Sequence, residues 1–404
     1  MNYVAPAFAS NTKLQVPTGV NDPVFNAKLT AAGLVPGQPF PNNTIPASLI
    51  DPNAVLFLNS GIVPKPNLAN GEIISSANQP IDVTDYILRV DHNINDKWHL
   101  LGHYMHDAVS QGYAQPMLGW SGASYNTITS TLANPSWSAT VKLAGTITPN
   151  LLLEASFNYD GNIINIVNSP NSLTPSGWSV NRYFNNSSQN FPNMHWGAPY
   201  NTQENPGSAP WHNAAQDYMP RVDISYTVGR HAMKYGFSYN RYTKNQQLFG
   251  EPGGNFSFGT LSGDSMMDMV LGLASNYDQN QALPVRHYVN QTPSVYFNDN
   301  WRTSPNFSLQ LGFRYDALPH AWERQNYLAN FDPNRYLPSQ SPVWNSNGSL
   351  NPNGPGFQVV NGTEFYLNGM YFAGQNGNPR GLVTNDYGTF QPRVGFSWDV
   401  NGQR

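Results

Sequence analysis

The stretch Phe307–Asp316, FSLQLGFRYD, alternates large apolar side chains with polar or small ones. Alternate residues of a β-strand point to opposite faces, so this pattern predicts a strand with two unlike faces. The apolar face carries Phe307, Leu309, Leu311, Phe313 and Tyr315. The polar face carries Ser308, Gln310, Gly312, Arg314 and Asp316. Such a strand separates an apolar environment from a polar one.

Similar alternation predicts eight further strands, over residues 82–94, 97–107, 137–147, 151–160, 219–228, 231–242, 294–302 and 393–400. Short and long connections alternate along the chain. The short connections carry turn residues, namely Asn95-Asp96, Pro149-Asn150, Gly229-Arg230 and Ser304-Pro305-Asn306. The long connections cover residues 108–136, 161–218, 243–293 and 317–392. Structureless connections of this length are rare in compact soluble domains.

Short turns at one end and long loops at the other are typical of transmembrane β-barrels, whose strands span about 9–11 residues. We therefore predict an all-β fold, an antiparallel transmembrane β-barrel surrounded by outer-membrane lipid in a bacterium. A soluble sandwich or propeller also alternates, but such folds seldom place every long loop at one end. Aromatic side chains are expected at the two membrane surfaces, at Tyr86, Trp98, Trp137, Tyr159, Tyr226, Trp301, Tyr315 and Trp398.

The predicted strands divide the chain into two parts. Residues 1–81 are expected to be an irregular extracellular-loop segment that leads into the barrel, and residues 82–404 a partial barrel domain. One short helix is expected at residues 264–273. Nine strands leave two open edges, which lipid cannot satisfy, so we expect an internal piece of a larger barrel. No signal peptide is recognisable after Met1.

Composition excludes several functional classes. Charged residues make up 11% of the chain and aromatic residues 13%, and Cys is absent. Without Cys, neither disulfides nor Cys-based metal or redox sites can form. The 20 Lys and Arg residues against 24 Asp and Glu residues give a net charge of −4. Because nucleic-acid binding needs a basic surface, no nucleic-acid partner is expected.

No enzymatic motif stands out, and neither a catalytic residue nor a cofactor is expected. His99 and His103 share one strand face, but residues four apart in a strand lie about 13 Å apart, too far to share a metal ion. Asp264 and Asp268 resemble a carboxylate pair on a helix, yet helix capping by Asp264 and a solvated Asp268 explain them more simply. Residues 250–254 are glycine-rich but lack the Lys-Ser/Thr of a phosphate loop.

Charged residues recur on the predicted polar faces of the strands, with opposite signs often two residues apart. In a barrel they would face the lumen and form ladders across strands, or contact a plug or a ligand. Their balanced signs argue against a strongly ion-selective pore. They are Arg89, Asp91, Lys142, Glu154, Arg221, Asp223, Arg314, Asp316, Arg393 and Asp399.

Aromatic residues in the long loops are candidates for ligand binding, because Trp and Tyr among Asn and Ser suit saccharide stacking. The same side chains equally suit loops that pack on one another, and both interpretations stay open. They are Trp120, Tyr125, Trp178, Tyr183, Trp196, Trp211, Trp344 and Tyr366.

Several motifs resemble, in order over roughly residues 38–400, those of Oar-like TonB-dependent outer-membrane receptors. The matching stretches are residues 39–46 (PFPNNTIP), 50–52 (IDP), 89–97 (RVDHNINDK), 229–236 (GRHAMKYG), 296–315 and 391–398 (QPRVGFSW), with a looser match over 263–272. The resemblance implies a larger protein with an N-terminal β-sandwich, a plug and a barrel of about 22 strands. Neither a plug nor a TonB box is recognisable in this chain.

The resemblance implies that the intact protein captures a small extracellular ligand and imports it with energy transmitted by the TonB system through the plug. An oligosaccharide, a metal chelate or a peptide are the substrate classes in view. The plug and the remaining barrel strands would then be partners of this chain. Two alternatives remain from the sequence: a soluble secreted β-rich carbohydrate-binding or adhesion module, and a carbohydrate-active β enzyme, which lacks a candidate carboxylate pair.

Overall fold

The computed structural model describes residues 3–4, 13–69, 72–120, 125–184, 188–198, 200, 202–203, 206–247, 250–280, 284–346, 351–360 and 363–400. Its main feature is one antiparallel sheet of long strands. They are β3 (Ile81–Asn93), β4 (Trp98–Tyr113), β5 (Ser130–Thr148), β6 (Leu151–Asn168), β8 (Trp211–Val228), β9 (His231–Gln247), β12 (Val285–Ser304), β13 (Phe307–Asp316) and β19 (Phe390–Trp398).

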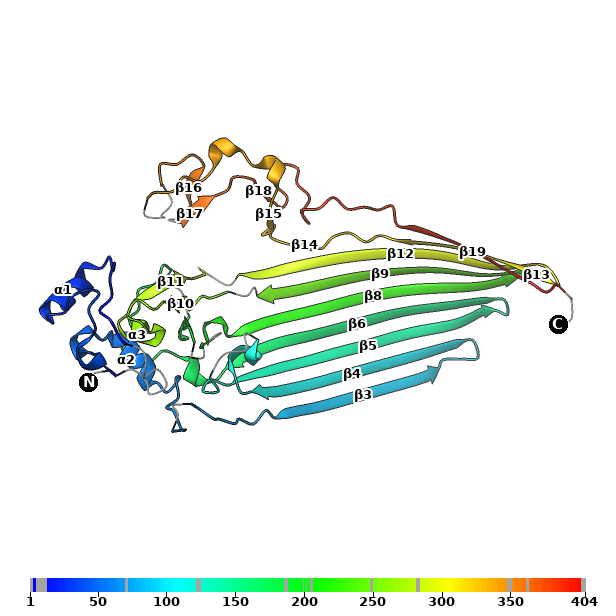
Figure 1. The fold of residues 1–404 in the computed structure, drawn as a ribbon. Coiled ribbons are helices and arrows are strands. Elements are labelled where there is room, and N and C mark those ends of the chain that lie inside the picture. The colour runs from blue at the N-terminus through cyan, green and yellow to red at the C-terminus, as the bar shows by residue number, and fades with distance from the viewer. Residues whose placement is uncertain are drawn as a thin grey trace.

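Each long strand pairs with the long strand before it and the one after it, in the order β19-β13-β12-β9-β8-β6-β5-β4-β3. The short strand β14 (Trp322–Glu323) adds to β12. Figure 1 shows the short turns at one end of the sheet, and the long connections with the N-terminal segment at the other. The predicted all-β antiparallel architecture, with its nine strands and its asymmetry of connections, is confirmed. In the described residues the sheet is open, with β3 and β19 at its edges.

Most strands are longer than the sequence predicted. β5 has 19 residues and β12 has 20, and parts of the predicted long connections belong to strands. The pairing of β4 with β5, for example, continues to Tyr113 and Ser130. The reason is that residues 130–136, STLANPS, are largely polar, so the apolar–polar alternation fades there. The backbone ladder needs no apolar side chains to continue.

Two aromatic rows cross the apolar face of the sheet, eight positions apart along the strands. Tyr226 and Tyr218 mark them on β8, and Phe307 and Tyr315 mark them on β13. At about 3.3 Å per residue, eight positions cover about 26 Å along a strand. An outer-membrane barrel carries an apolar band about 25 Å tall flanked by aromatic girdles, so the spacing of the two rows along the strands is of the same order as the height of that band. The row marked by Tyr218 and Tyr315 lies nearer the long loops, and the strand portions beyond it project toward those loops.

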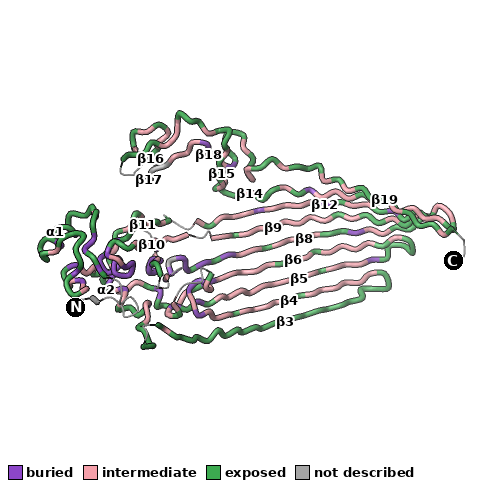
Figure 2. Tube along the Cα trace, viewed as in Figure 1, coloured by how far each residue is buried: buried purple, intermediate pink, exposed green. Residues whose placement is uncertain are grey.

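A folded layer, called the cap below, covers the long-loop end of the sheet. It comprises the described residues of 13–63, 170–203 and 250–280, with Tyr125 and Ile128. Its elements are α1 (Pro23–Ala31), β2 (Thr44–Ile45), α2 (Pro52–Asn59), β7 (Asn193–His195), β10 (Asn255–Phe258), α3 (Ser265–Val270) and β11 (Ala274–Asp278). Strands β7, β10 and β11 form a small sheet of their own. Figure 2 shows buried residues gathered in the cap rather than along the long strands.

The core of the cap joins segments that are far apart in the sequence. Phe57 of α2 is fully buried and contacts Phe191 edge-on, with ring centroids 5.3 Å apart. Met267 of α3 and Ile128 belong to the same cluster. Burying such side chains contributes about 1.5–3 kcal/mol each, so this cluster accounts for the order of the cap.

The expectation of an irregular segment over residues 1–81 is wrong for part of that range, because two helices form there. The Asp22 carboxylate accepts hydrogen bonds from the backbone N–H groups of Val24 and Phe25, and Pro23 occupies the first helical turn of α1. Asp51 caps α2 in the same way, before Pro52. An Asp N-cap followed by Pro satisfies the free N–H groups of a helix start and fixes its backbone. Among the described residues, no helix combines the length and apolarity needed to cross a membrane.

The helix expected at residues 264–273 is confirmed as α3, and the Asp264 carboxylate accepts a hydrogen bond from the Met267 N–H at 3.0 Å. The expectation that Asp268 is solvated is wrong. Asp268 has no exposed surface and accepts hydrogen bonds from the N–H of Leu261 and from the N–H and hydroxyl of Ser262. These donors take the place of water around the carboxylate, and they attach the loop at Leu261 and Ser262 to α3. Burial raises the pKa of the Asp268 carboxyl above its ordinary value.

The connection between β13 and β19 forms small hairpins, in which β15 (Ala329–Phe331) pairs with β18 (Met370–Phe372) and β16 (Phe357–Val360) with β17 (Thr363–Tyr366). Near the N-terminus, β1 (Tyr3–Val4) pairs with β2. Glu323 attaches the start of the β13–β19 connection to β12. Its carboxylate is fully buried and accepts hydrogen bonds from the N–H groups of His287, Gln325 and Tyr327 at 2.7–3.0 Å. Burial opposes ionisation, but these backbone donors outweigh it and lower the pKa of Glu323.

Candidate functional site

The polar face of the sheet carries the same ion-pair motif, Arg-x-Asp, on three strands. In β3, β8 and β13 an Arg lies two residues before an Asp on the same face. In each case Nε donates to Oδ2 at 2.6–2.8 Å and Nη2 to Oδ1 at 2.6–3.1 Å. The pairs are Arg89–Asp91, Arg221–Asp223 and Arg314–Asp316. Two parallel hydrogen bonds fix the geometry of the guanidinium against the carboxylate.

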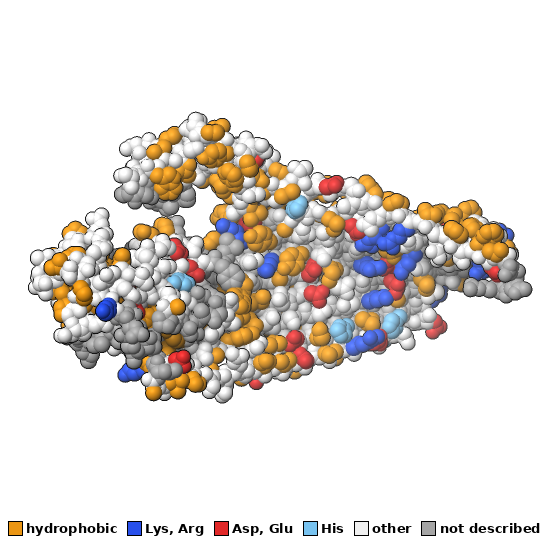
Figure 3. Space-filling model, viewed as in Figure 1, with side chains coloured by type: hydrophobic (Ala, Val, Ile, Leu, Met, Phe, Trp, Pro, Cys, Tyr) orange, Lys and Arg blue, Asp and Glu red, His pale blue; other side chains and the backbone are white. Residues whose placement is uncertain are grey.

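Further polar contacts link side chains of different strands on the same face, and two of them involve the Arg-x-Asp pairs. Lys142 of β5 contacts Glu154 of β6 at 2.5 Å, and His99 Nε2 of β4 lies 3.3 Å from Asp91 Oδ1 of β3. The Tyr296 hydroxyl of β12 donates to Asp223 of β8, across the intervening β9. Figure 3 shows Lys and Arg side chains in a band across the sheet toward the short turns. Partly exposed pairs of this kind contribute about 0–1 kcal/mol each, so their role is to line and order a polar surface.

The remaining predicted lumenal charges lie at the β19 edge. Arg393 is exposed and faces Gly312 of β13 in the register. Asp399 follows β19, and its backbone N–H donates to the carbonyl of Asn306 at 2.8 Å.

Nearer the long loops, the polar face carries carboxylates in place of ion pairs. Asp85 of β3 lies directly opposite Asp107 of β4, and Asp160 of β6 lies directly opposite Asp217 of β8. None of the described ion pairs includes any of these four residues. Sequence reasoning missed these pairs because strand register, not spacing along the chain, brings them together.

The structure does not bring the eight candidate loop aromatics into one site. Trp196 and Trp211 are each only 6% exposed, which fits the second of the two interpretations, loops that pack on one another, better than ligand stacking. Trp196 contributes to the cap core, and the Trp211 indole N–H donates to the carbonyl of Gln247. Tyr125 and Trp178 are half-buried against the cap core. Tyr366 packs edge-on against Phe357.

The three exposed candidates lie in separate places. Trp120 contacts the edge of Trp211, with ring centroids 5.4 Å apart, and Tyr183 lies against Tyr277 of β11. Trp344, in the β13–β19 connection, is 63% exposed. Of the eight predicted residues, Trp178 is the one that lines the pocket described next.

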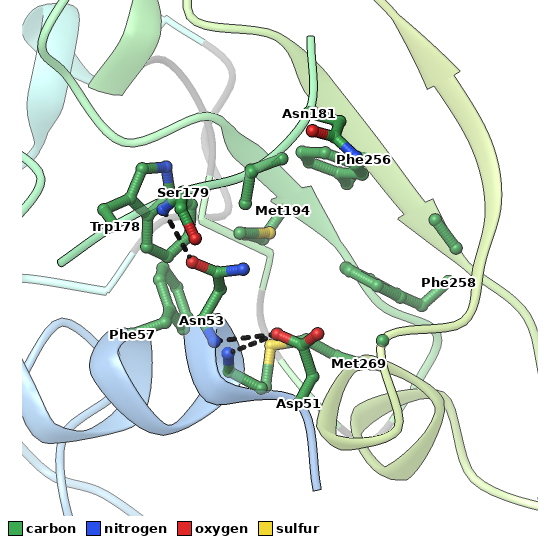
Figure 4. A pocket seen from close by; sticks show the side chains of 14 residues that line it. Asp51, Asn53, Phe57, Trp178, Ser179, Asn181, Met194, Phe256, Phe258 and Met269 are labelled. Carbon is green, nitrogen blue, oxygen red and sulfur yellow. Dashed lines mark hydrogen bonds between the residues drawn. The ribbon is translucent and has the colours of Figure 1, made fainter. Parts of the chain in front are cut away.

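The cap contains a pocket of about 420 Å³ between α2, residues 178–181, β10 and α3 (Figure 4). Its volume lies in the range of small-molecule sites, about 300–1,000 Å³. Trp178, Phe256 and Phe258 contribute aromatic walls. Apolar side chains of Ala54, Phe57, Met194 and Met269 also line it, and all four are buried.

Polar groups face the same pocket, and two of them are held by backbone contacts. Asp51 Oδ1 accepts hydrogen bonds from the N–H groups of Asn53 and Ala54 at 2.8 and 3.2 Å. Asn53 Oδ1 accepts a hydrogen bond from the Ser179 N–H at 2.9 Å. The α2 N-cap thus fixes one wall of the pocket and joins it to the Trp178 loop. Sequence reasoning missed Asp51 and Asn53, although the Asp51-Pro52 pair is a readable helix-start signal.

Comparisons with known proteins place the chain among barrel proteins. A family model described as Outer membrane beta barrel domain matches residues 3–404. A search of curated proteins found no match. Among solved structures, the chain is similar to the outer membrane transporter YddB from Escherichia coli, with 11% sequence identity and a TM-score of 0.38. That alignment covers 63% of this chain and 30% of the transporter chain.

Proposed function

Because the chain belongs to the Outer membrane beta barrel domain family, we propose that it forms part of a TonB-dependent transporter that captures and imports a small substrate. The protein is located in the bacterial outer membrane. In this proposal the plug and the remaining strands of the intact receptor complete the barrel. TonB-transmitted energy then moves the substrate inward, and this chain performs no covalent chemistry.

One observation carries the proposal, namely the combination of a polar, ion-paired strand face with a folded cap at the long-loop end. A lumen that held only lipid or apolar side chains would leave the Arg-x-Asp pairs without polar surroundings, at a cost of several kcal/mol per unsolvated charge. A cap with a small-molecule pocket at the outer end suits capture before import. The motifs that resemble Oar-like receptors support TonB dependence.

Uptake by whole cells tests the proposal. Cells with the intact gene and cells with the gene disrupted are given a labelled neutral oligosaccharide, a ferric chelate and a peptide, each with and without a protonophore. We expect energised accumulation of one class that is lost on disruption and on collapse of the proton-motive force. Equal accumulation of all three by both strains, or accumulation unaffected by the protonophore, contradicts the proposal.

The alternative of a soluble secreted module is set aside, because the chain belongs to an outer-membrane family. Binding without import is a separate possibility for an outer-membrane barrel. The protonophore arm distinguishes it, since binding alone does not depend on the proton-motive force.

A further inference from the structure

The cap pocket presents hydrogen-bonding groups whose orientation is fixed by the fold. Because Asn53 Oδ1 accepts the Ser179 N–H, the Nδ2 amide of Asn53 must be the free end of the side chain. Figure 4 shows this nitrogen turned toward the middle of the pocket, and no described group accepts a hydrogen bond from it. Asn53 is half-buried, so this nitrogen can donate a hydrogen bond to a ligand that supplies an acceptor.

Acceptors face the pocket as well. Asp51 uses Oδ1 for both helix N–H groups, which leaves Oδ2 available beside Gly272. A Cβ atom at Gly272 would lie 3.1 Å from this oxygen, and the backbone there has a φ of +73°. Glycine is therefore required both by the backbone conformation and by the close approach to the carboxylate. The Asn181 amide at the exposed edge of the pocket adds a further donor and acceptor.

Aromatic rings provide the complementary surface. Trp178 packs edge-on against the core residue Phe191, with ring centroids 5.1 Å apart, so its position is fixed by the cap core. Phe256 and Phe258 lie on β10. Phe256 packs against Tyr277 of β11, with ring centroids 4.4 Å apart. The pocket thus has rigid flat walls, which bind a ligand at a low cost in side-chain entropy.

The charge of the pocket restricts the ligand further. Asp51 is the one charged residue among the described lining residues, and no Lys, Arg or His is among them. An anionic ligand would meet an uncompensated carboxylate and no cation. A ligand with flat apolar faces and hydroxyl groups at its edges would satisfy the free amides, the carboxylate oxygen and the aromatic walls together.

We propose that this pocket binds a ring of a neutral carbohydrate, held by stacking on the aromatic walls and by hydrogen bonds to Asp51, Asn53 and Asn181. The proposal names the substrate class for the transporter and rests on the proposed function only for the import that follows binding. Among the eight candidate loop aromatics, the proposal assigns ligand binding to Trp178, because the other seven lie outside the pocket.

Calorimetric titration of the purified full-length receptor in detergent tests the assignment. The probes are cellotetraose, maltotetraose and xylotetraose, with tetragalacturonate as the anionic comparison. We expect at least one neutral tetrasaccharide to bind and tetragalacturonate not to bind. Trp178→Ala should weaken binding about tenfold or more, because it removes a stacking wall. Trp344→Ala removes an exposed Trp outside the pocket and should leave the affinity unchanged.

Trp178 also contacts the cap core, so a second variant keeps the test independent of folding. Asn181→Ala alters only an exposed edge of the pocket and should weaken binding about two- to tenfold. The assignment is overturned if no neutral tetrasaccharide binds, if tetragalacturonate binds as tightly, or if Asn181→Ala leaves the affinity unchanged. A saccharide that binds as expected but is not accumulated by energised cells leaves this inference standing and contradicts the proposed transport.

Discussion

Asp160 of β6 and Asp217 of β8 face each other directly across the polar side of the sheet. Asp217 Oδ2 accepts a hydrogen bond from the Asn240 amide at 3.1 Å, while its Oδ1 is buried without a partner. Like charges directly opposite each other destabilise an antiparallel pair. The fold therefore tolerates a repulsive contact here, six residues along the same strands from Glu154 and Asp223, each of which has a cationic partner.

Replacing one carboxylate of this pair should stabilise the barrel. In Asp217→Asn, the amide oxygen keeps the contact with Asn240 and the repulsion of Asp160 is removed. We expect the free energy of unfolding to rise by about 0.2–1 kcal/mol. The measurement is the urea dependence of unfolding of the full-length protein refolded into lipid vesicles.

The same substitution six residues further along β8 provides the matched control. Asp223→Asn removes the negative charge that pairs with Arg221 and replaces one of the two oxygens that accept hydrogen bonds from Arg221 and the Tyr296 hydroxyl by an NH2 donor. We expect this variant to lose stability, by about 1–3 kcal/mol for the unpaired polar groups. If both variants shift stability in the same direction, the assignment of one repulsive and one attractive environment is wrong.

The two faces of β13 should respond oppositely to a new charge. Phe313 lies between the aromatic rows on the apolar face, opposite the apolar residues Phe297 and Pro392, and Gln310 lies on the polar face. Phe313→Arg places a cation against lipid within the apolar band, which costs up to about 2–4 kcal/mol, whereas Gln310→Arg faces the lumen. We expect assembly in the membrane, measured as the heat-modifiable fraction on gels, to fall for Phe313→Arg alone. Equal loss for both variants would show that the two faces of β13 do not meet different environments.

The stability of the cap should fall as the pH rises from about 4 toward neutrality, through Asp268. Burial raises the folded-state pKa of this carboxyl, so the folded chain binds its proton more tightly than the unfolded chain does. Its contribution is therefore fully present below the unfolded pKa, about 4, and is lost as the pH rises through the raised folded value. Between pH 4 and pH 7, the free energy of unfolding should fall less in Asp268→Asn than in the wild type. Urea titrations followed by Trp fluorescence measure it.

For each protein we compare the free energy of unfolding at pH 4 with that at pH 7. A change in the overall stability of a variant affects both values equally and does not alter their difference. Asp278→Asn, at an exposed carboxylate of β11, is the control and should retain the wild-type difference. An identical pH difference in wild type and Asp268→Asn would contradict the assignment.

The membrane-spanning sheet was predictable because lipid on one face and polar surroundings on the other impose a period of two. In Phe307–Asp316 the predicted and observed strand bounds coincide. The strand predicted at residues 219–228 begins at Trp211 in the structure. The prediction started too late because the portion before Tyr218, nearer the long loops, lacks one consistently apolar face. Backbone pairing continues there without a hydrophobic signal.

The cap and its pocket were not predictable from local patterns. Helix α1 buries only Phe25 and Leu29, so its amphipathic signal is weak despite the Asp22-Pro23 start. The pocket combines Asp51, Trp178 and Phe256 from three distant segments. Only tertiary packing sets that combination, just as it buries Trp196 and leaves Trp344 exposed.

The orientation of the sheet in the membrane is the central claim, and single-cysteine labelling tests it most directly. The chain contains no Cys, so each introduced thiol is the sole target in this chain. One Cys replaces Ser346 in the β13–β19 connection, and another replaces Asn150 in the turn between β5 and β6. Intact cells are treated with a membrane-impermeant maleimide. We predict labelling at position 346 only, with position 150 labelled after the outer membrane is permeabilised. Labelling at position 150 but not at position 346 in intact cells would contradict the account.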